Sequence, residues 1–359
     1  MHVRGEGHRN LLKRVAERLL EYEFSFWHYG DSIGFEGLLA AAKLLSAPYF
    51  EGWVDGALRS WAARREPFRE LDNTAPGHAL CLAYERGGDR RLLEAAAGLV
   101  EFLSSRRRIR GAFVSFERAP LREPYGGARL SASDAELLRD PGAGVFVDCL
   151  HFDPPFFAHL GTLTGDAALV DLAAEQALAH LALLQDESGL VWHFWLERTE
   201  RPYGYGWARG QGWALLGLLD LLAYLPKEHA AYARLHEALT RLVDALAEHQ
   251  RPTGGWATVA HDPTSGDETS TAAFAAAGFA RGVQAGLLEE DYRDRALAAW
   301  RRAWSQVDPH GKVDGVSAAV WASTEPSHYP NVPTGFVVPW GQGALLLAAA
   351  RIAELAPDS

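Results

Sequence analysis

Apolar and polar positions along the chain alternate between two kinds of helical segment. In the first kind, small or apolar residues occupy every side, as in residues 212–225, which are mostly Ala, Leu, Gly and Trp. In the second kind, apolar residues recur at helical spacing and charged residues fill the other positions, as in residues 230–249. A helix that is apolar all round is buried, whereas an amphipathic helix keeps one face in water. The pattern therefore predicts inner helices that alternate with outer ones.

Six segments of each kind follow one another. The predicted inner helices cover residues 34–45, 76–86, 154–164, 212–225, 269–285 and 341–355. The predicted outer helices cover residues 11–20, 48–65, 89–105, 166–184, 230–249 and 290–307. Six buried helices inside six half-exposed ones predict an all-α fold, an (α/α)6 barrel, and no linker divides residues 1–359, so a single domain is expected. An open α-solenoid is the alternative.

A loop rich in aromatic and charged residues precedes each predicted inner helix. These loops cover residues 24–33, 68–75, 107–153, 189–211, 251–268 and 308–340. Because each leads into an inner helix, all six should open at one end of the barrel. Loops longer than about 15 residues are usually functional or disordered, and the longest one, 107–153, is expected to contain a short strand at 112–116 and a helical turn at 133–138. This arrangement favours a closed barrel with a mouth.

Composition narrows the class of protein. Hydrophobic residues make up 48% of the chain, enough for a large core, and the net charge of −11 argues against a nucleic-acid-binding surface. The two cysteines, Cys81 and Cys149, offer neither a disulfide framework nor a cysteine-rich metal site, and the histidines lack short metal-binding spacing. The N-terminus has no signal-peptide core, and no long apolar stretch is free of charge. We therefore expect no membrane span, a cytoplasmic location and no metal.

Three motifs concentrate carboxylates, a histidine, an arginine and tryptophans between positions 147 and 213. The first is Val147-Asp148-x-Leu150, followed by Pro155-Phe156 and Thr164-Gly165-Asp166. The second is Leu184-Gln185-Asp186 with Gly189-Leu190-Val191-Trp192-His193. The third is Trp207-Ala208-Arg209-Gly210-Gln211-Gly212-Trp213. In this order on a six-pair helical frame, the motifs resemble those of the unsaturated glucuronyl and rhamnogalacturonyl hydrolases, glycoside hydrolase families 88 and 105.

The resemblance implies a fold, an activity and a set of site residues. It implies an (α/α)6 barrel without metal or cofactor that acts on oligosaccharides left by polysaccharide lyases, which end in a 4,5-unsaturated uronic acid. It assigns Asp148 as the proton donor and Asp72 as a second catalytic aspartate. It places His193, Trp207, Arg209 and Trp213 at the substrate. Gln211 stands where the family usually has asparagine, and His151-Phe152 where an aromatic residue and methionine are common, so the polysaccharide (pectin, ulvan, glycosaminoglycan or a gellan-like polymer) stays open.

Each candidate also has a structural interpretation. Asp148 could cap a helix, but Asp153 directly before Pro154 is the better predicted cap, which leaves Asp148 free for chemistry. Asp72 could cap the helix near residue 76. The planar guanidinium of Arg209 fits a uronate carboxylate with two hydrogen bonds, although a structural ion pair is the alternative. His193 could be a buried core histidine. The other expected substrate-binding residues, among which the tryptophans could simply pack the barrel, are Trp27, His28, His151, Trp256 and Trp340.

The predicted function is removal of a terminal 4,5-unsaturated uronic acid by hydration of its C4=C5 vinyl ether, with Asp148 as the acid. A carboxyl group that donates a proton at neutral pH needs a raised pKa, which burial or a neighbouring carboxylate provides. Two other kinds of enzyme fit the same barrel: an inverting glycosidase acting on saturated uronides, and a sugar epimerase. A non-catalytic sugar-binding barrel is the remaining alternative.

Overall fold

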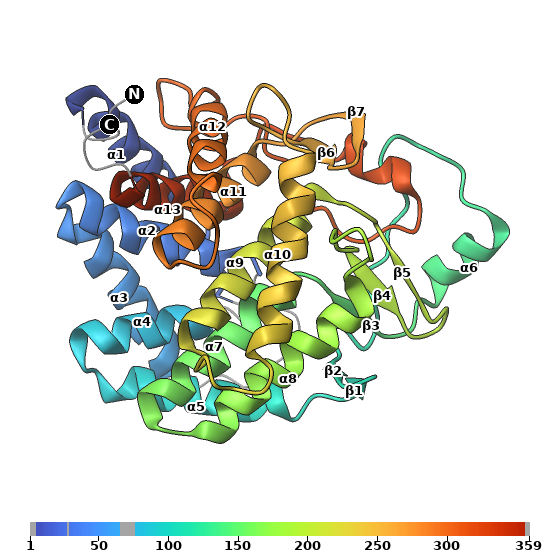
Figure 1. Ribbon diagram of the computed structural model, residues 1–359, viewed down its shortest axis with the longest axis horizontal. Coiled ribbons are helices and arrows are strands. Elements are labelled where there is room, and N and C mark those ends of the chain that lie inside the picture. The colour runs from blue at the N-terminus through green and yellow to red at the C-terminus, as the bar shows by residue number, and fades with distance from the viewer. Residues whose placement is uncertain (1–4, 27–28, 65–75, 356–359) are drawn as a thin grey trace.

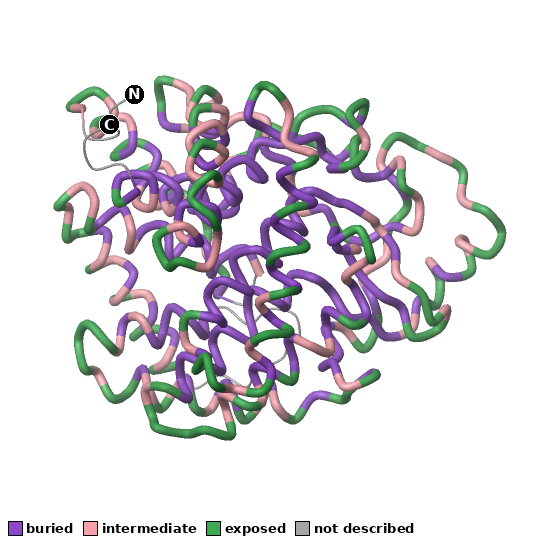
Figure 2. The backbone as a smooth tube through the Cα atoms, viewed as in Figure 1, coloured by how far each residue is buried: buried purple, intermediate pink, exposed green. Residues whose placement is uncertain are grey.

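Six helices form a closed inner ring in the computed structural model, which describes residues 5–26, 29–64 and 76–355. The inner helices are α2 (Asp31–Leu45), α4 (Gly77–Gly87), α7 (Cys149–Thr164), α9 (Ala208–Tyr224), α11 (Thr269–Gln284) and α13 (Pro339–Leu355). Each contacts the next in this order, and α13 contacts α2, which closes the ring. Buried positions gather in these helices, whereas exposed positions lie on the outer helices and loops (Figure 2).

Six further helices surround the ring and alternate with it along the chain (Figure 1). They are α1 (Glu6–Leu20), α3 (Pro48–Arg64), α5 (Arg90–Ser104), α8 (Ala167–Leu184), α10 (Tyr232–Glu248) and α12 (Tyr292–Trp304). Their charged residues face solvent, while their periodic apolar residues pack on the ring, as Leu235, Leu239 and Leu242 do in α10. The predicted (α/α)6 barrel is therefore confirmed.

The close approach of α2 and α13 depends on glycine. A Cβ added at Gly37 of α2 would lie 2.4 Å from the backbone oxygen of Gly343 in α13. No side chain larger than hydrogen fits between the two backbones at this point. The two helices can therefore pack with their backbones in contact, which completes the ring.

Helix α7 begins at Cys149, five residues before the predicted start at Pro154. The prediction that Asp153 caps this helix is wrong, because Asp153 lies inside it and forms a buried ion pair with Arg106. Pro154 cannot donate a hydrogen bond to the carbonyl of Leu150. Gly217 of α9 lies directly against that carbonyl, so close that a Cβ at position 217 would come within 2.1 Å of the oxygen. The proline is thus accommodated where two inner helices meet.

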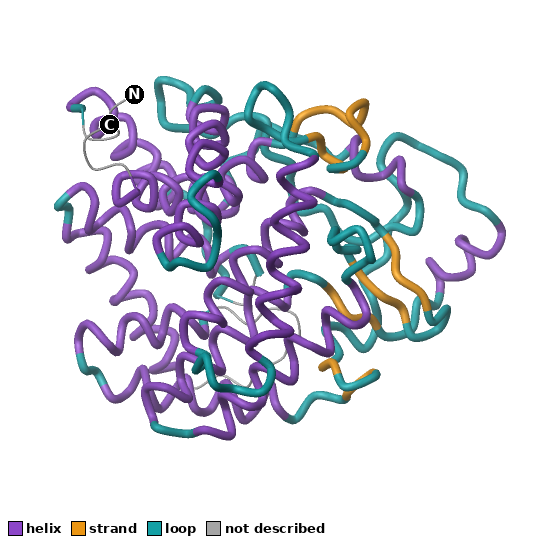
Figure 3. The backbone as a smooth tube through the Cα atoms, viewed as in Figure 1, coloured by secondary structure: helices purple, strands orange, loops and turns teal. Residues whose placement is uncertain are grey.

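The long loops carry short antiparallel strands, which form three separate small sheets in the half of the molecule away from the two termini (Figure 3). The strands are β1 (Arg108–Ile109), β2 (Ala112–Phe113), β3 (Gly144–Phe146), β4 (Phe194–Leu196), β5 (Arg201–Tyr203), β6 (Ala257–Val259) and β7 (Asp262–Asp267). The predicted strand at 112–116 appears as β2, and the predicted helical turn at 133–138 as α6 (Ala132–Arg139). Strand β3 pairs with β4, which pairs with β5. The last loop contains the 3-10 helix η1 (Pro326–Asn331).

Among the described residues, one helix is long and apolar enough to cross a membrane by length and composition alone. This helix is α8, with a mean hydropathy of 1.4 and 44% of its length buried. It carries Asp171 and Glu175 and packs against α7 and α10. Its buried positions, such as Ala173, Ala177 and Leu184, belong to the core of the barrel. The apolar character of α8 is therefore explained by its packing on the ring.

Candidate active site

The pairing of β3 with β4 brings Asp148 and His193 together. The backbone N–H of Val147 donates to the carbonyl of His193 at 2.9 Å, directly beyond the paired residues Phe146 and Phe194. Asp148 follows at the entrance to α7, where its side chain makes no capping hydrogen bond. Its Oδ2 atom lies 3.8 Å from Nε2 of His193 and has no hydrogen-bond partner among the described residues. Asp148 is therefore held in place by its backbone, and its Oδ2 atom makes no hydrogen bond to the described residues.

The surroundings of Asp148 keep its carboxyl group protonatable near neutral pH. Burial raises the pKa of Asp148 to about 7, although the positive charge of Arg209 and the proximity of His151 act in the opposite direction. Burial, followed by the charges of His328 and Arg209, holds the pKa of His193 well below its usual value, so this histidine is neutral. A buried carboxyl group that carries a proton near neutral pH is suited to general acid catalysis.

Tyr329, in η1, connects the last loop to this histidine. Its hydroxyl group lies 2.9 Å from Nδ1 of His193. Burial and the charge of Asp148 raise the pKa of Tyr329 well above its usual value, so the hydroxyl group stays protonated. The indole ring of Trp207 covers the other side of the imidazole, with the ring centroids 4.2 Å apart. Tyr329 was not predicted, and the only signal for it was its place in the loop 308–340.

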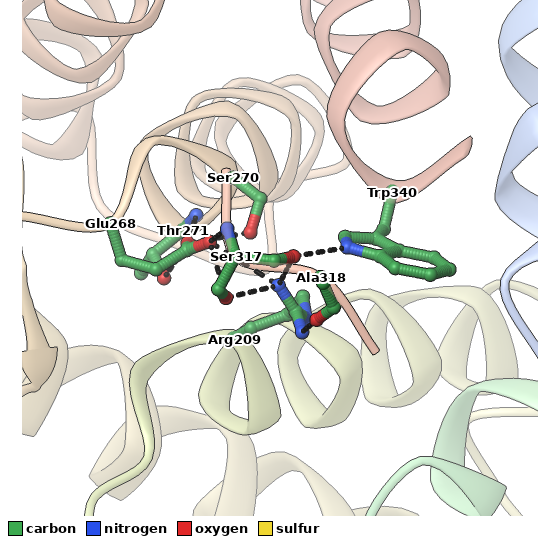
Figure 4. A network of polar contacts seen from close by, with 7 residues as sticks. All are labelled: Arg209, Glu268, Ser270, Thr271, Ser317, Ala318 and Trp340. Atoms are coloured by element: carbon green, nitrogen blue, oxygen red, sulfur yellow. Dashed lines mark hydrogen bonds and ion pairs between the residues drawn. The ribbon is translucent and has the colours of Figure 1, made fainter. Parts of the chain in front are cut away.

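Arg209, at the start of α9, belongs to a buried polar network that joins α9, α11 and the last loop (Figure 4). Its Nη1 atom forms an ion pair with Oε1 of Glu268 at 3.2 Å and donates to the carbonyl and hydroxyl oxygens of Ser317 at 3.0 and 2.8 Å. Its Nη2 atom donates to the carbonyl of Ala318 at 2.9 Å. The rings of Trp207 and Trp340 lie 5.1 and 5.3 Å from the guanidinium carbon.

This placement differs from the predicted role of Arg209 as the clamp for a substrate carboxylate. The side chain is fully buried, and its Nη1 atom is committed to acceptors within the protein. Trp340 is also fixed by the network, because its Nε1 donates to the carbonyl of Ser317 at 2.9 Å. The structure therefore favours the ion-pair alternative: Arg209 organises the wall of tryptophans beside Asp148 and contributes positive charge to it.

The remaining predicted substrate-binding residues lie in different parts of the molecule, and some lie outside the described residues. Trp213 is buried in the ring, where it packs edge-on against Phe274, so it contributes packing. Trp256 lies between α10 and α11, and its Nε1 donates to the carbonyl of Leu246 at 2.8 Å, which favours the packing alternative. His151 is buried between Glu36, which its Nε2 faces at 3.4 Å, and Asp148, so its role at the substrate stays a prediction. Trp27, His28 and Asp72 lie outside the described residues.

A metal-binding arrangement does not occur around Asp148 in the described part of the chain. The group of three ligand side chains that lie close enough to share an ion consists of Glu36, His78 and Asp220. His151 separates this group from Asp148, since it contacts Glu36 on one side and influences the Asp148 carboxyl group on the other.

The chain is a glycoside hydrolase, and its barrel holds a buried, protonatable aspartate at position 148. The family model of Glycosyl Hydrolase Family 88 matches residues 12–356, so the chain belongs to this family. The chain is 25% identical over 349 residues to the unsaturated rhamnogalacturonyl hydrolase YesR of Bacillus subtilis, covering 96% of this chain and 94% of that protein.

Solved structures share the fold. A possible member of glycoside hydrolase family 105 from Klebsiella pneumoniae superposes with a TM-score of 0.82 at 20% identity, over 99% of this chain and 95% of that one. The unsaturated glucuronyl hydrolase of Bacillus sp. GL1 superposes with a TM-score of 0.70 at 18% identity, over 97% and 96% of the two chains. At these identities the likeness concerns the barrel.

Proposed function

We propose that this enzyme removes a 4,5-unsaturated uronic acid from the non-reducing end of an oligosaccharide by hydrating its C4=C5 double bond. The observation that carries the proposal is the state of the Asp148 carboxyl group. It is buried, it makes no capping hydrogen bond to α7, and its pKa is raised to about 7. The Bacillus subtilis relative is an unsaturated rhamnogalacturonyl hydrolase. A second relative, 28% identical over 152 residues that make up 42% of this chain, is the unsaturated 3S-rhamnoglycuronyl hydrolase of Formosa agariphila.

The proposed reaction begins with a proton transfer from Asp148 to C4 of the sugar. The electron pair of the double bond forms the new C4–H bond, and the ring oxygen stabilises the positive charge that develops at C5. Water then adds to C5 and returns a proton to the Asp148 carboxylate, which restores the acid. The resulting hemiketal opens, the glycosidic bond breaks, and the leaving sugar departs with its own hydroxyl group. One carboxyl group thus serves first as acid and then as base.

His193 and Tyr329 position the acid and the water in this scheme. The hydroxyl group of Tyr329 lies 2.9 Å from Nδ1 of His193, and in the tautomer that carries its ring proton on Nε2 the histidine accepts from this hydroxyl group and turns Nε2–H toward Asp148 at 3.8 Å. That separation is longer than a hydrogen bond, so Nε2–H can serve a water molecule or a sugar hydroxyl group beside Asp148. A neutral histidine in this place assists without adding a charge that would ionise the acid.

The test measures double-bond hydration directly. Lyase-generated oligosaccharides lose the ultraviolet absorbance of their conjugated double bond only when it is hydrated. The Asp148→Asn variant preserves shape but removes the proton, so turnover should fall by about 10²–10⁴-fold. Asp171→Asn, in the exposed part of α8, is the matched control and should keep the parental rate. Parental activity of the folded Asp148→Asn variant would refute the assignment.

Isotopic labels distinguish this reaction from ordinary glycoside hydrolysis. In heavy water, deuterium should appear at C4 of the released keto-acid, and heavy oxygen from water should appear at C5. Heavy oxygen at C1 would instead support an inverting glycosidase. Release of an epimer without bond cleavage would support an epimerase, and binding without turnover a sugar-binding barrel.

A further inference from the structure

A second cluster of ionisable side chains lies inside the barrel, on the far side of His151 from Asp148. It borders a cavity of about 1010 Å³ that is lined by Glu36, His78, Asp220 and Arg281. The cavity also contacts Tyr224, the last residue of α9, and Glu354, next to the end of α13. Since the inner helices start at the loops that carry Asp148 and His193, their C-terminal ends mark the opposite end of the barrel. The cavity opens toward these ends, while the cluster itself lies deeper in the barrel, where His151 stands between Glu36 and Asp148.

We propose that Glu36, His78 and Asp220 bind a divalent metal ion, with zinc as the best match. One ligand atom from each residue lies within 4.8 Å of the others. Nδ1 of His78 and Oε1 of Glu36 are 3.5 Å apart and do not share a hydrogen bond. Two ligand atoms bound to tetrahedral zinc at about 2.0–2.2 Å lie about 3.3–3.6 Å from each other. The observed separation is compatible with two ligands of one ion as well as with a direct ion pair.

Unsatisfied polar atoms point to the same site. Glu36 is only 7% exposed, and its Oε1 atom faces Nδ1 of His78 at 3.5 Å and Nε2 of His151 at 3.4 Å without hydrogen-bond geometry to either ring. His78 is 9% exposed, and both of its ring nitrogens lack such a partner in the same part of the chain. Buried polar groups are almost always hydrogen-bonded, and exceptions call for an unseen ligand or a functional reason. A cation coordinated by Oε1 of Glu36 and a ring nitrogen of His78 would satisfy both residues.

Arg281 is compatible with this site. Its guanidinium group pairs with Oδ1 of Asp220, and a carboxylate offers a second oxygen to an ion. Carboxylates that bind metals are commonly oriented by hydrogen-bond donors behind them, which is the position that Arg281 takes. Glu36 and Asp220 thus bring two carboxylates to the site, and Arg281 offsets the charge of one of them.

The ligand types indicate zinc. One imidazole and two carboxylates, with a remaining position filled by water from the cavity, form an open zinc site of three protein ligands. The ion would connect α2, α4 and α9 across the inside of the ring. The three ligands are far apart in the sequence, which is why no metal-binding motif indicates the site.

The experiment compares zinc binding by the stripped parent protein and by variants. The protein is freed of metal with a chelator, zinc is added, and the bound ion is measured by atomic emission and by competition with a chromophoric chelator. One zinc ion per chain is expected. His78→Gln and Asp220→Asn should each weaken zinc binding by more than about 10-fold, since loss of even an outer orienting group costs about 10–100-fold. His229→Gln, in a surface pair with Asp171, is the matched control and should bind as the parent does.

A second readout does not depend on the folding of any variant. Cobalt added to the stripped parent protein should give the visible absorption of a tetrahedral site with nitrogen and oxygen ligands, and zinc should displace it. A parent protein that retains no zinc would overturn the proposal. So would a folded His78→Gln protein that binds zinc as tightly as the parent. Binding lost equally in the His229→Gln control would show adventitious surface binding and would also overturn it.

Discussion

Replacing Glu268 by Gln tests how strongly the network around Arg209 holds the barrel together. Both carboxylate oxygens of Glu268 accept hydrogen bonds: Oε1 from Arg209 and Ser317, and Oε2 from the backbone N–H and hydroxyl of Thr271. In glutamine, one of these oxygens becomes an NH₂ group that faces donors. The variant also leaves the buried guanidinium group without its counter-charge, because Arg209 and Glu268 are 0% and 1% exposed.

The magnitude follows from the loss of a buried counter-charge. Breaking a buried ion pair by removing one partner costs about 3–5 kcal/mol. A chain of 359 residues has an entropy of unfolding of about 0.75 kcal/mol/K. The midpoint of thermal unfolding should therefore fall by about 4–7 °C in Glu268→Gln. Scanning calorimetry, under conditions where unfolding is reversible, measures this shift.

A double-mutant cycle separates the ion pair from other effects. Arg209→Met removes the charge that needs compensation, so adding Glu268→Gln to it should cost less than Glu268→Gln costs alone. The matched control is the ion pair of Arg107 and Glu197, whose side chains are 44% and 45% exposed. Exposed ion pairs contribute about 0–1 kcal/mol, so breaking this pair should change the free energy of unfolding by no more than that amount. A Glu268→Gln midpoint equal to that of the parent, or strictly additive effects in the cycle, would refute the structural role of the pair.

Three further predictions concern the acid, its neighbour and the packing of the ring. Because burial raises the pKa of Asp148 to about 7, kcat/KM should fall about tenfold per pH unit above that value as the acid form is lost; a profile that stays flat there would contradict the role of the acid. Tyr329→Phe should leave Nδ1 of His193 buried without a partner, which should lower the free energy of unfolding by about 1–3 kcal/mol. In steady-state kinetics the same variant should lower kcat more than it changes KM. Gly343→Ala should destabilise the barrel by about 1–3 kcal/mol in urea unfolding, because a Cβ there meets the backbone of α2 at 2.3 Å, whereas Gly98→Ala, with open space around it, should not.

The helical ring could be predicted because its signal is spread over many residues. An inner helix that is buried on all sides needs small or apolar residues at nearly every position. Six such helices can therefore be recognised in the sequence even when the predicted end residues are wrong by a few positions. The start of α7 was missed because Asp153 and Pro154 form a locally good helix start, which tertiary packing against Gly217 and Arg106 overrides. The single-domain division and the cytoplasmic location stay predictions.

The site was less predictable, because its geometry depends on contacts between distant segments. Asp148 and His193 were singled out by their motifs, but strands β3 and β4, which bring them together, are three residues each and too short to show periodicity. The partners of Arg209 come from α11 and the loop after α12. Nothing in the third motif indicates that its arginine points inward, because a guanidinium group fits a substrate carboxylate and Glu268 equally well.

The network around Arg209 also bears on the chemistry, because the same guanidinium group acts on Asp148. Its positive charge lowers the pKa of Asp148 against the larger effect of burial. Glu268 compensates that charge at 3.2 Å, so the carboxyl group of Asp148 experiences only part of it. Without Glu268, the uncompensated guanidinium group should stabilise the ionised form of Asp148 and lower its pKa. The alkaline fall of kcat/KM in Glu268→Gln should therefore begin at lower pH than in the parent, and a fall at unchanged or higher pH would mean that the ion pair acts on the fold alone.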